Sequence, residues 1–344
     1  MKPIHFVPDV STQHLSEQDS KRYFSIVGLA VFALAAVNVG VQFLFAFLAR
    51  QFLPLSWLTS PLFSYLRSMI PLYLFALPVF LLILRRLPAV RPLSQPIKAG
   101  AWFGGLCVAF LFMQIGNYIG QMLMNWMSLI TQNSFENPIS STTSGSPVWL
   151  NLIFLAVLAP ILEELVFRKL LCDRLLPLGE GYAVVISGIA FGLFHGNFFQ
   201  FFYACALGIL FGYVYVKSGK IIWSILYHVT INLLGGVFSG WLVDKIDLDA
   251  LTDFINEAAE TGVYNISAIE GQLPYLMMLV CYSFLLYGLA IVGIIYLIRT
   301  RKKIHLESGL LPPPAEKRVS TVLLTPGVAL AIAFFAFLFV ISLL

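Results

Sequence analysis

The sequence predicts an all-α polytopic membrane protein with about nine transmembrane helices. Of its 344 residues, 59% are hydrophobic and only 11% are charged, and the mean hydropathy is +0.87, well outside the range of a soluble globular domain. Apolar runs long enough to cross a hydrocarbon core about 30 Å thick recur along the chain. The formal net charge of +4 comes without a basic patch interleaved with aromatic residues, so no nucleic-acid partner is expected.

The nine apolar runs are the predicted spans, and they make the lipid bilayer an expected partner. The fifth run is the shortest, and a break at Gly196-Asn197 separates it from the sixth. We expect spans over residues 24–49, 69–84, 99–130, 147–171, 182–195, 198–216, 221–243, 275–298 and 323–344.

Basic residues predict the orientation of these spans, because loops rich in Lys and Arg stay in the cytoplasm. With nine spans and a cytoplasmic N-terminus, all but three of the 21 Lys and Arg residues fall on the inside. The exceptions are Arg50, Arg67 and Lys245. Acidic residues gather instead in the outer segment 244–273, so the charge asymmetry also supports the number of spans.

The polar segments divide the chain into five parts. A loop over residues 133–147, rich in Ser, Thr, Asn, Gly and Pro, is predicted to be an exposed connection. The parts are a polar cytoplasmic tail (1–23), three N-terminal spans (24–130), a motif-bearing core (147–243), an acidic outer loop (244–273) and two C-terminal spans (274–344).

Pairs of glycines four residues apart occur in several spans, where they let helices approach closely in lipid. We expect them to serve packing within the chain, with a dimerisation face as the alternative. The pairs are Gly100/Gly104, Gly116/Gly120, Gly188/Gly192 and Gly208/Gly212.

Ionisable residues inside the fourth span form the first polar cluster of the core. Glu164 and Arg168 are four residues apart and share a helix face, whereas Glu163 points about 100° away. Arg168 is therefore expected to neutralise Glu164 and to leave Glu163 free. The alternative is that both acids merely pair with basic residues at the cytoplasmic edge of the helix.

Two histidines and an amide lie in later spans at a similar depth. His195 ends the fifth span, and His228 shares a face of the seventh with Asn232, four residues on. Taken alone, His195 can be a core histidine, and His228 with Asn232 an interhelical clamp. These residues and Glu163 all lie about 12–22 Å from the cytoplasmic helix ends. A carboxylate, two imidazoles and an amide in one layer can activate water and hold an oxyanion.

These clusters resemble the three motifs of the CAAX-protease and bacteriocin-processing (CPBP, Abi) family of intramembrane endopeptidases. The resemblance covers about residues 147–240, less than a third of the chain, and each motif alone is weak. In this chain the motifs are Glu163-Glu164 with Arg168, Phe191 with His195, and His228 with Asn232.

The resemblance implies a helical membrane core whose water-accessible cavity holds the site. The implied roles are a general base (Glu163) assisted by an imidazole (His195), an oxyanion-binding pair (His228 and Asn232), and residues that support this arrangement (Glu164, Arg168 and Phe191).

Metal dependence remains open between two alternatives. Glu163, His195 and His228 would supply three ligands for zinc, with an open fourth position. The helical His-Glu-x-x-His arrangement of zinc proteases is absent, and Asn232 is a poor zinc ligand but a good amide donor. The ligand chemistry therefore favours a site without a cofactor.

The expected substrate is a peptide or a membrane protein, lipidated or not, that reaches the cavity from the cytoplasmic leaflet. The absence of eukaryotic targeting signals favours a bacterial plasma membrane. A non-catalytic bacteriocin-immunity or scaffold protein is the alternative from a different class. A transporter is less favoured, because no pair of interrupted spans repeats in the two halves of the chain.

Overall fold

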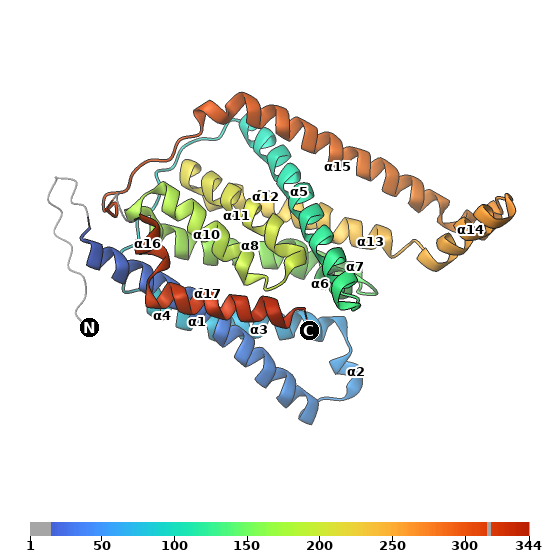
Figure 1. Ribbon diagram of the computed structural model, residues 1–344, viewed down its shortest axis with the longest axis horizontal. Coiled ribbons are helices and arrows are strands. Elements are labelled where there is room, and N and C mark those ends of the chain that lie inside the picture. Colours follow the sequence, from blue (N-terminus) through green and yellow to red (C-terminus); the bar gives the residue numbers. More distant parts are fainter. Residues whose placement is uncertain (1–14, 315–317, 344) are drawn as a thin grey trace.

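The computed structural model describes residues 15–314 and 318–343, and these ranges contain helices and loops but no β-strand (Figure 1). The first 14 residues of the predicted tail, which include Lys2, lie outside them, as do Lys317 and Leu344. Seven helical stretches are long and apolar enough to cross a membrane: Glu17–Phe52, Pro61–Leu84, Ala99–Thr131, Val148–Leu178, Phe198–Ser218, Ile221–Val243 and Glu270–Lys303. The protein is therefore an all-α, multi-pass membrane protein.

Two of the predicted spans are short helices in the structure. The fifth corresponds to α10 (Glu180–Phe194), which has 15 residues, and the ninth to α17 (Pro326–Ile341), which has 16. At 1.5 Å per residue these helices measure about 22–24 Å, less than the hydrocarbon thickness of about 30 Å. The count of nine complete crossings thus stays a prediction.

The remaining elements subdivide the long helical stretches and their connections. The α-helices are α1 (Glu17–Phe52), α2 (Leu55–Leu58), α3 (Pro61–Ile70), α4 (Leu77–Leu84), α5 (Ala99–Thr131), α6 (Pro138–Thr143), α7 (Val148–Leu150), α8 (Ala159–Glu164), α9 (Asp173–Leu175), α11 (Phe198–Ser218), α12 (Ile221–Ile231), α13 (Ser239–Val243), α14 (Leu248–Thr261), α15 (Leu273–Thr300) and α16 (Arg318–Leu323). The π-helical segments are η1 (Pro71–Ala76), η2 (Asn151–Leu158), η3 (Leu165–Cys172) and η5 (Asn232–Phe238), and 3₁₀ turns form η4 (Leu176–Leu178), η6 (Ile266–Ala268), η7 (Glu270–Gln272) and η8 (Arg301–Lys303).

Helix α11 lies at the centre of the bundle, where it packs against α10, α5 and α12, and α5 in turn packs against α15 (Figure 1). On the other side α1 packs against α17, α4 and η1. Glycines allow the closest of these approaches. A Cβ added to Gly188 of α10 would lie 2.6 Å from the backbone nitrogen of Ile209, and one added to Gly208 of α11 would lie 2.8 Å from the Gly188 carbonyl oxygen. These two glycines therefore serve packing within the chain, as expected.

Loops predicted to be cytoplasmic meet at one end of the molecule, here called the basic end. The Gln95 amide donates to the Ser218 carbonyl (2.9 Å), and the Leu311 amide donates to the Pro177 carbonyl (2.8 Å). The basic end comprises residues 85–98, 173–180, 217–220 and 299–311. Its position in the cytoplasm stays a prediction, but its segments lie together as the charge pattern requires.

The loops predicted to lie outside meet at the opposite end, here called the far end and comprising residues 133–147 and 244–273. There the Gly145 amide donates to the Asp244 carboxylate (3.2 Å). Both loops differ from the sequence prediction, because the first contains α6 and the second contains α14. Asp247 caps α14 by accepting a hydrogen bond from the Ala250 amide. This residue is a helix-start signal, but the many acidic residues around it led us to predict a loop.

The approach of α10 to α11 predicts a specific cost for a small substitution. Gly188→Ala should destabilise the protein by about 1–3 kcal/mol, because the new methyl group overlaps the backbone of α11. Thermal unfolding in detergent measures the effect. Gly40→Ala is the matched control, since a Cβ at Gly40 meets nothing within 4 Å. Equal unfolding temperatures for the two variants would show that α10 and α11 are not packed through Gly188.

Candidate active site

The Glu164–Arg168 ion pair is buried at the centre of the fourth span. Arg168 Nε donates to Glu164 Oε2 at 3.0 Å and Arg168 Nη2 donates to Glu164 Oε1 at 3.3 Å. Both side chains are 0% exposed. This bidentate pairing is the one expected from a spacing of four residues, and it satisfies most of the polar atoms of both groups.

Aromatic rings surround the remaining part of the Arg168 guanidinium. Its Cζ lies 5.2 Å from the ring centroid of Phe191 and 5.9 Å from that of Phe211. Arg168 Nη1 has no hydrogen-bond partner within the described residues, so attraction to the faces of the rings is the favourable contact left to the group. Phe191 also contacts both histidines edge-on, with ring centroids 5.0 Å from His195 and 5.4 Å from His228.

His228 lies between the two glutamates. Its Nδ1 is 3.2 Å from Glu164 Oε1, and its Nε2 is 3.7 Å from Glu163 Oε2. Glu164 is held as a carboxylate by Arg168 and can only accept, so the proton of the ring sits on Nδ1. Nε2 then faces Glu163 and can share a proton with it. Glu163 itself is 20% exposed, in contrast to the fully buried Glu164.

His195 follows the last residue of α10, where the chain reverses into α11. Gly196 has φ +64°, a left-handed conformation that glycine adopts without strain, and Asn197 begins the next helix as its cap. His195 Nδ1 lies 2.9 Å from the Phe191 carbonyl. A carbonyl only accepts, so Nδ1 donates and Nε2 keeps a free lone pair.

The side chain of Asn232 links the seventh span to the fourth by a hydrogen bond. Its Nδ2 donates to the Leu155 carbonyl at 3.0 Å. In the π-helical segment η2 the Ala159 amide bonds to the Phe154 carbonyl, five residues back. The next residue, Pro160, has no amide proton for Leu155, so the Asn232 amide takes its place.

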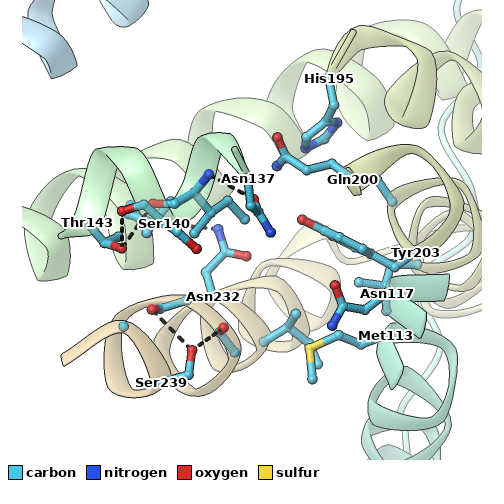
Figure 2. Close-up of a pocket in the computed structure, with 18 of the residues that line it drawn as sticks. Met113, Asn117, Asn137, Ser140, Thr143, His195, Gln200, Tyr203, Asn232 and Ser239 are labelled. Carbon is cyan, nitrogen blue, oxygen red and sulfur yellow. Dashed lines mark hydrogen bonds between the residues drawn. The ribbon is translucent and has the colours of Figure 1, made fainter. Parts of the chain in front are cut away.

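The four predicted site residues line one cavity of about 500 Å³, and Figure 2 shows His195 and Asn232 in its wall. The cavity runs from Glu163 to Asp244 and therefore extends toward the far end of the molecule. This differs from the expected access through the cytoplasmic leaflet, which would lead from the basic end.

Further polar residues, which the sequence did not single out, line the same cavity: Asn117 of α5, Asn137 at the start of α6, and Gln200 and Tyr203 of α11 (Figure 2). Asn197 positions Gln200, because its Oδ1 accepts from the Gln200 amide (3.0 Å) and its Nδ2 donates to Gln200 Oε1 (2.9 Å). Asn-x-x-Gln ahead of an apolar run is a capping signal. That signal could have placed Gln200 near the helix start, but not in the cavity.

The arrangement does not assemble the three ligands that the zinc alternative requires. Across residues 15–314 and 318–343, no group of three or more His, Cys, Asp or Glu side chains is placed to hold a metal ion. His228 directs one nitrogen to Glu164 and the other to Glu163, while His195 Nδ1 is bonded to a backbone carbonyl. These contacts leave Nε2 of both histidines available, as the outer contacts of metal-bound histidines do, so a site without a cofactor stays a prediction.

Comparisons with known proteins match the part of the chain that contains this site. Residues 145–234 match the model of the family described as type II CAAX prenyl endopeptidase Rce1-like. UPF0177 protein YxdF from Lactococcus lactis subsp. lactis (strain IL1403) is 25% identical over 141 residues, which cover 41% of this chain and 77% of the relative. No solved structure matches. The resemblance indicated by the three motifs is therefore confirmed over residues 145–234, which are similar to the Rce1-like family, and that family indicates a membrane-embedded protease.

Proposed function

We propose that this protein is an intramembrane endopeptidase in which Glu163 activates the attacking water. The observation that carries the proposal is the contrast between two adjacent carboxylates. Glu164 is fully buried and neutralised by Arg168, whereas Glu163 is partly exposed on the cavity wall. A free carboxylate in a cavity inside a membrane protein is costly unless it has a function, and proton abstraction from water is within its chemistry.

The reaction follows from the positions of the proton donors and acceptors. A water between Glu163 and His195 Nε2 gives a proton to the Glu163 carboxylate, and the resulting hydroxide adds to the carbonyl carbon of the scissile peptide bond. The C–N bond then breaks, and the Glu163 proton passes to the leaving nitrogen. The products are a carboxylic acid and an amine, and the carboxylate of Glu163 is restored.

His228 and Asn232 would stabilise the oxyanion formed during this addition. His228 Nε2 donates to an oxyanion when the ring carries both protons, and Glu164 holds the other nitrogen in place. One proton of the Asn232 amide is engaged by Leu155, which fixes the plane of the amide and leaves the second proton available. Fixed donors of this kind are effective because they need little reorganisation as charge develops.

The proposal assigns the catalytic core to residues 147–243 and makes the other spans its support. The polar tail (1–23), the three N-terminal spans (24–130), the acidic outer segment (244–273) and the two C-terminal spans (274–344) complete the division. A bacterial plasma membrane is the proposed location, and the Lactococcus relative is consistent with it. The substrate is a peptide or membrane protein, and lipidation is not required by the cavity described above.

Replacing the proposed base gives the first test of the activity. Glu163→Gln removes the proton acceptor while keeping the shape of the side chain, so cleavage should fall by about 10²–10⁴-fold. Mass spectrometry of membrane peptides from cells with the unaltered protein and with the variant identifies the cut bond, and the purified proteins then give the rates. Glu257→Gln, on the exposed helix α14, is the control and should cleave normally. Undiminished cleavage by purified Glu163→Gln would contradict the role of Glu163 as the base, whereas the absence of any cleavage by the unaltered protein would favour the non-catalytic immunity or scaffold function.

Replacing the adjacent glutamate should affect folding instead. Glu164→Gln leaves the Arg168 guanidinium buried without its counter-charge, and such changes cost about 3–5 kcal/mol. Thermal unfolding in detergent should therefore show a marked loss for Glu164→Gln and little change for Glu163→Gln. Equal stability of the two variants would contradict the separate roles assigned to the pair.

Metal removal separates the two chemical alternatives. If Glu163 activates water without a metal, as the proposed reaction has it, treatment of the purified enzyme with 1,10-phenanthroline should leave the cleavage rate essentially unchanged. The rate is measured on the peptide found by mass spectrometry. Loss of activity that is restored by added zinc would instead establish a metalloprotease.

A further inference from the structure

The cavity is closed toward the basic end. One to three turns beyond Glu164, the side chains of Arg168, Leu171 and Cys172 are 0% exposed, and so are Phe211 of α11 and Ser224 of α12. These residues form a packed layer between the site and the loops of the basic end. The described residues therefore offer no route for a substrate from that side.

The cavity is open toward the far end. Its outer lining includes Ser140, Ser144 and Asp244, all of which are exposed, and its inner wall contains Glu163. If the basic end lies in the cytoplasm, as the distribution of Lys and Arg predicts, the mouth lies on the opposite, non-cytoplasmic face. The direction of access then excludes a tail that remains in the cytoplasm.

The lining has the chemistry of a peptide-binding surface. Five carboxamide side chains face the cavity: Gln114, Asn117, Asn137, Gln200 and Asn232. Each carboxamide can both donate and accept hydrogen bonds, as each peptide unit of a substrate backbone does. A set of such groups along one cavity can therefore satisfy an extended chain taken out of water.

The charges of the lining discriminate against a terminal carboxylate. Glu163 and Asp244 are acidic, and no Lys or Arg is among the described residues of the cavity wall. A substrate that ends in a carboxylate near the acidic residues of this cavity would meet repulsion and find no Lys or Arg to pair with, whereas a neutral or basic internal segment would not meet this repulsion.

We propose that the site takes an extended, neutral or basic internal segment of a polypeptide presented on the non-cytoplasmic face of the membrane. This inference rests on the proposed endopeptidase function and names its class of substrate. The segment enters from the far end past Ser140, Ser144 and Asp244, its backbone pairs with the carboxamides, and the scissile bond reaches Glu163.

Cysteine labelling tests the direction of access without requiring activity. Asn117→Cys is placed in a chain in which Cys205 and Cys281 are changed to alanine, while Cys107 and Cys172 stay because both are 0% exposed. A membrane-impermeant maleimide should label Asn117→Cys several-fold faster in right-side-out vesicles than in inside-out vesicles. Lys220→Cys, at the basic end, is the control and should show the reverse.

The assigned direction would be wrong if Asn117→Cys reacted only in inside-out vesicles. It would also be wrong if Asn117→Cys and Lys220→Cys reacted from the same side of the membrane. Ser140→Cys, at the mouth, provides a second variant that answers the same question if Asn117→Cys does not fold.

The peptides that depend on Glu163 test the substrate class. Their cut sites should map to internal segments on the non-cytoplasmic side, and removal of a C-terminal peptide from a lipidated cytoplasmic tail would overturn the proposal. If Glu163→Gln leaves all peptide ends unchanged, both the endopeptidase function and this substrate fail. The labelling would still establish which face the cavity opens to, so the two failures can be told apart.

Discussion

The buried pair of Glu164 and Arg168 is the interaction on which the rest of the site depends. Two charges held at 0% exposure are tolerated only when each is compensated, and the contacts of this pair with His228 and Phe191 set the rotation of the fourth span in the bundle. That rotation turns Glu163 toward the cavity. Glu164 also holds His228 through Nδ1, so one anion orients both the carboxylate beside it and an imidazole three spans later. The geometry of the candidate site thus depends on how one salt bridge is satisfied.

Irregular helix geometry supplies the second constraint. The motifs of the fourth and seventh spans adjoin π-helical segments, η2 and η3 on one and η5 on the other, and such segments are frequent at functional sites. In η2 a backbone hydrogen bond spans five residues, and Pro160 lacks the amide proton that the Leu155 carbonyl would accept in this pattern. The Leu155 carbonyl instead accepts a hydrogen bond from the side-chain amide of Asn232. A backbone defect on one helix therefore fixes a side chain on another. The two helices are held at a common depth by a bond that neither could form in a regular α-helix.

Sequence patterns predicted those features that depend on one helix at a time. The opposite environments of Glu163 and Glu164 follow from helical spacing, and the reversal after His195 follows from Gly196-Asn197. Features that depend on contacts between helices could not be predicted from the sequence. The polar composition of the loop around Asn137 predicted exposure, although that residue lines the cavity. The link between Asn232 and Leu155 requires knowledge of the π-helical register, for which a single sequence carries no reliable signal.

The short length of α10 has a consequence for the membrane itself. This helix presents Val185 and Ile189 outward, yet its 15 residues fall short of a typical acyl layer. Lipids beside it must compress, or headgroups must sink, to avoid exposing the ends of the helix. Such a dimple shortens the distance between bulk solvent and the buried imidazoles. Acyl-chain length in the host membrane thereby becomes a physical parameter of the enzyme, alongside its own side chains.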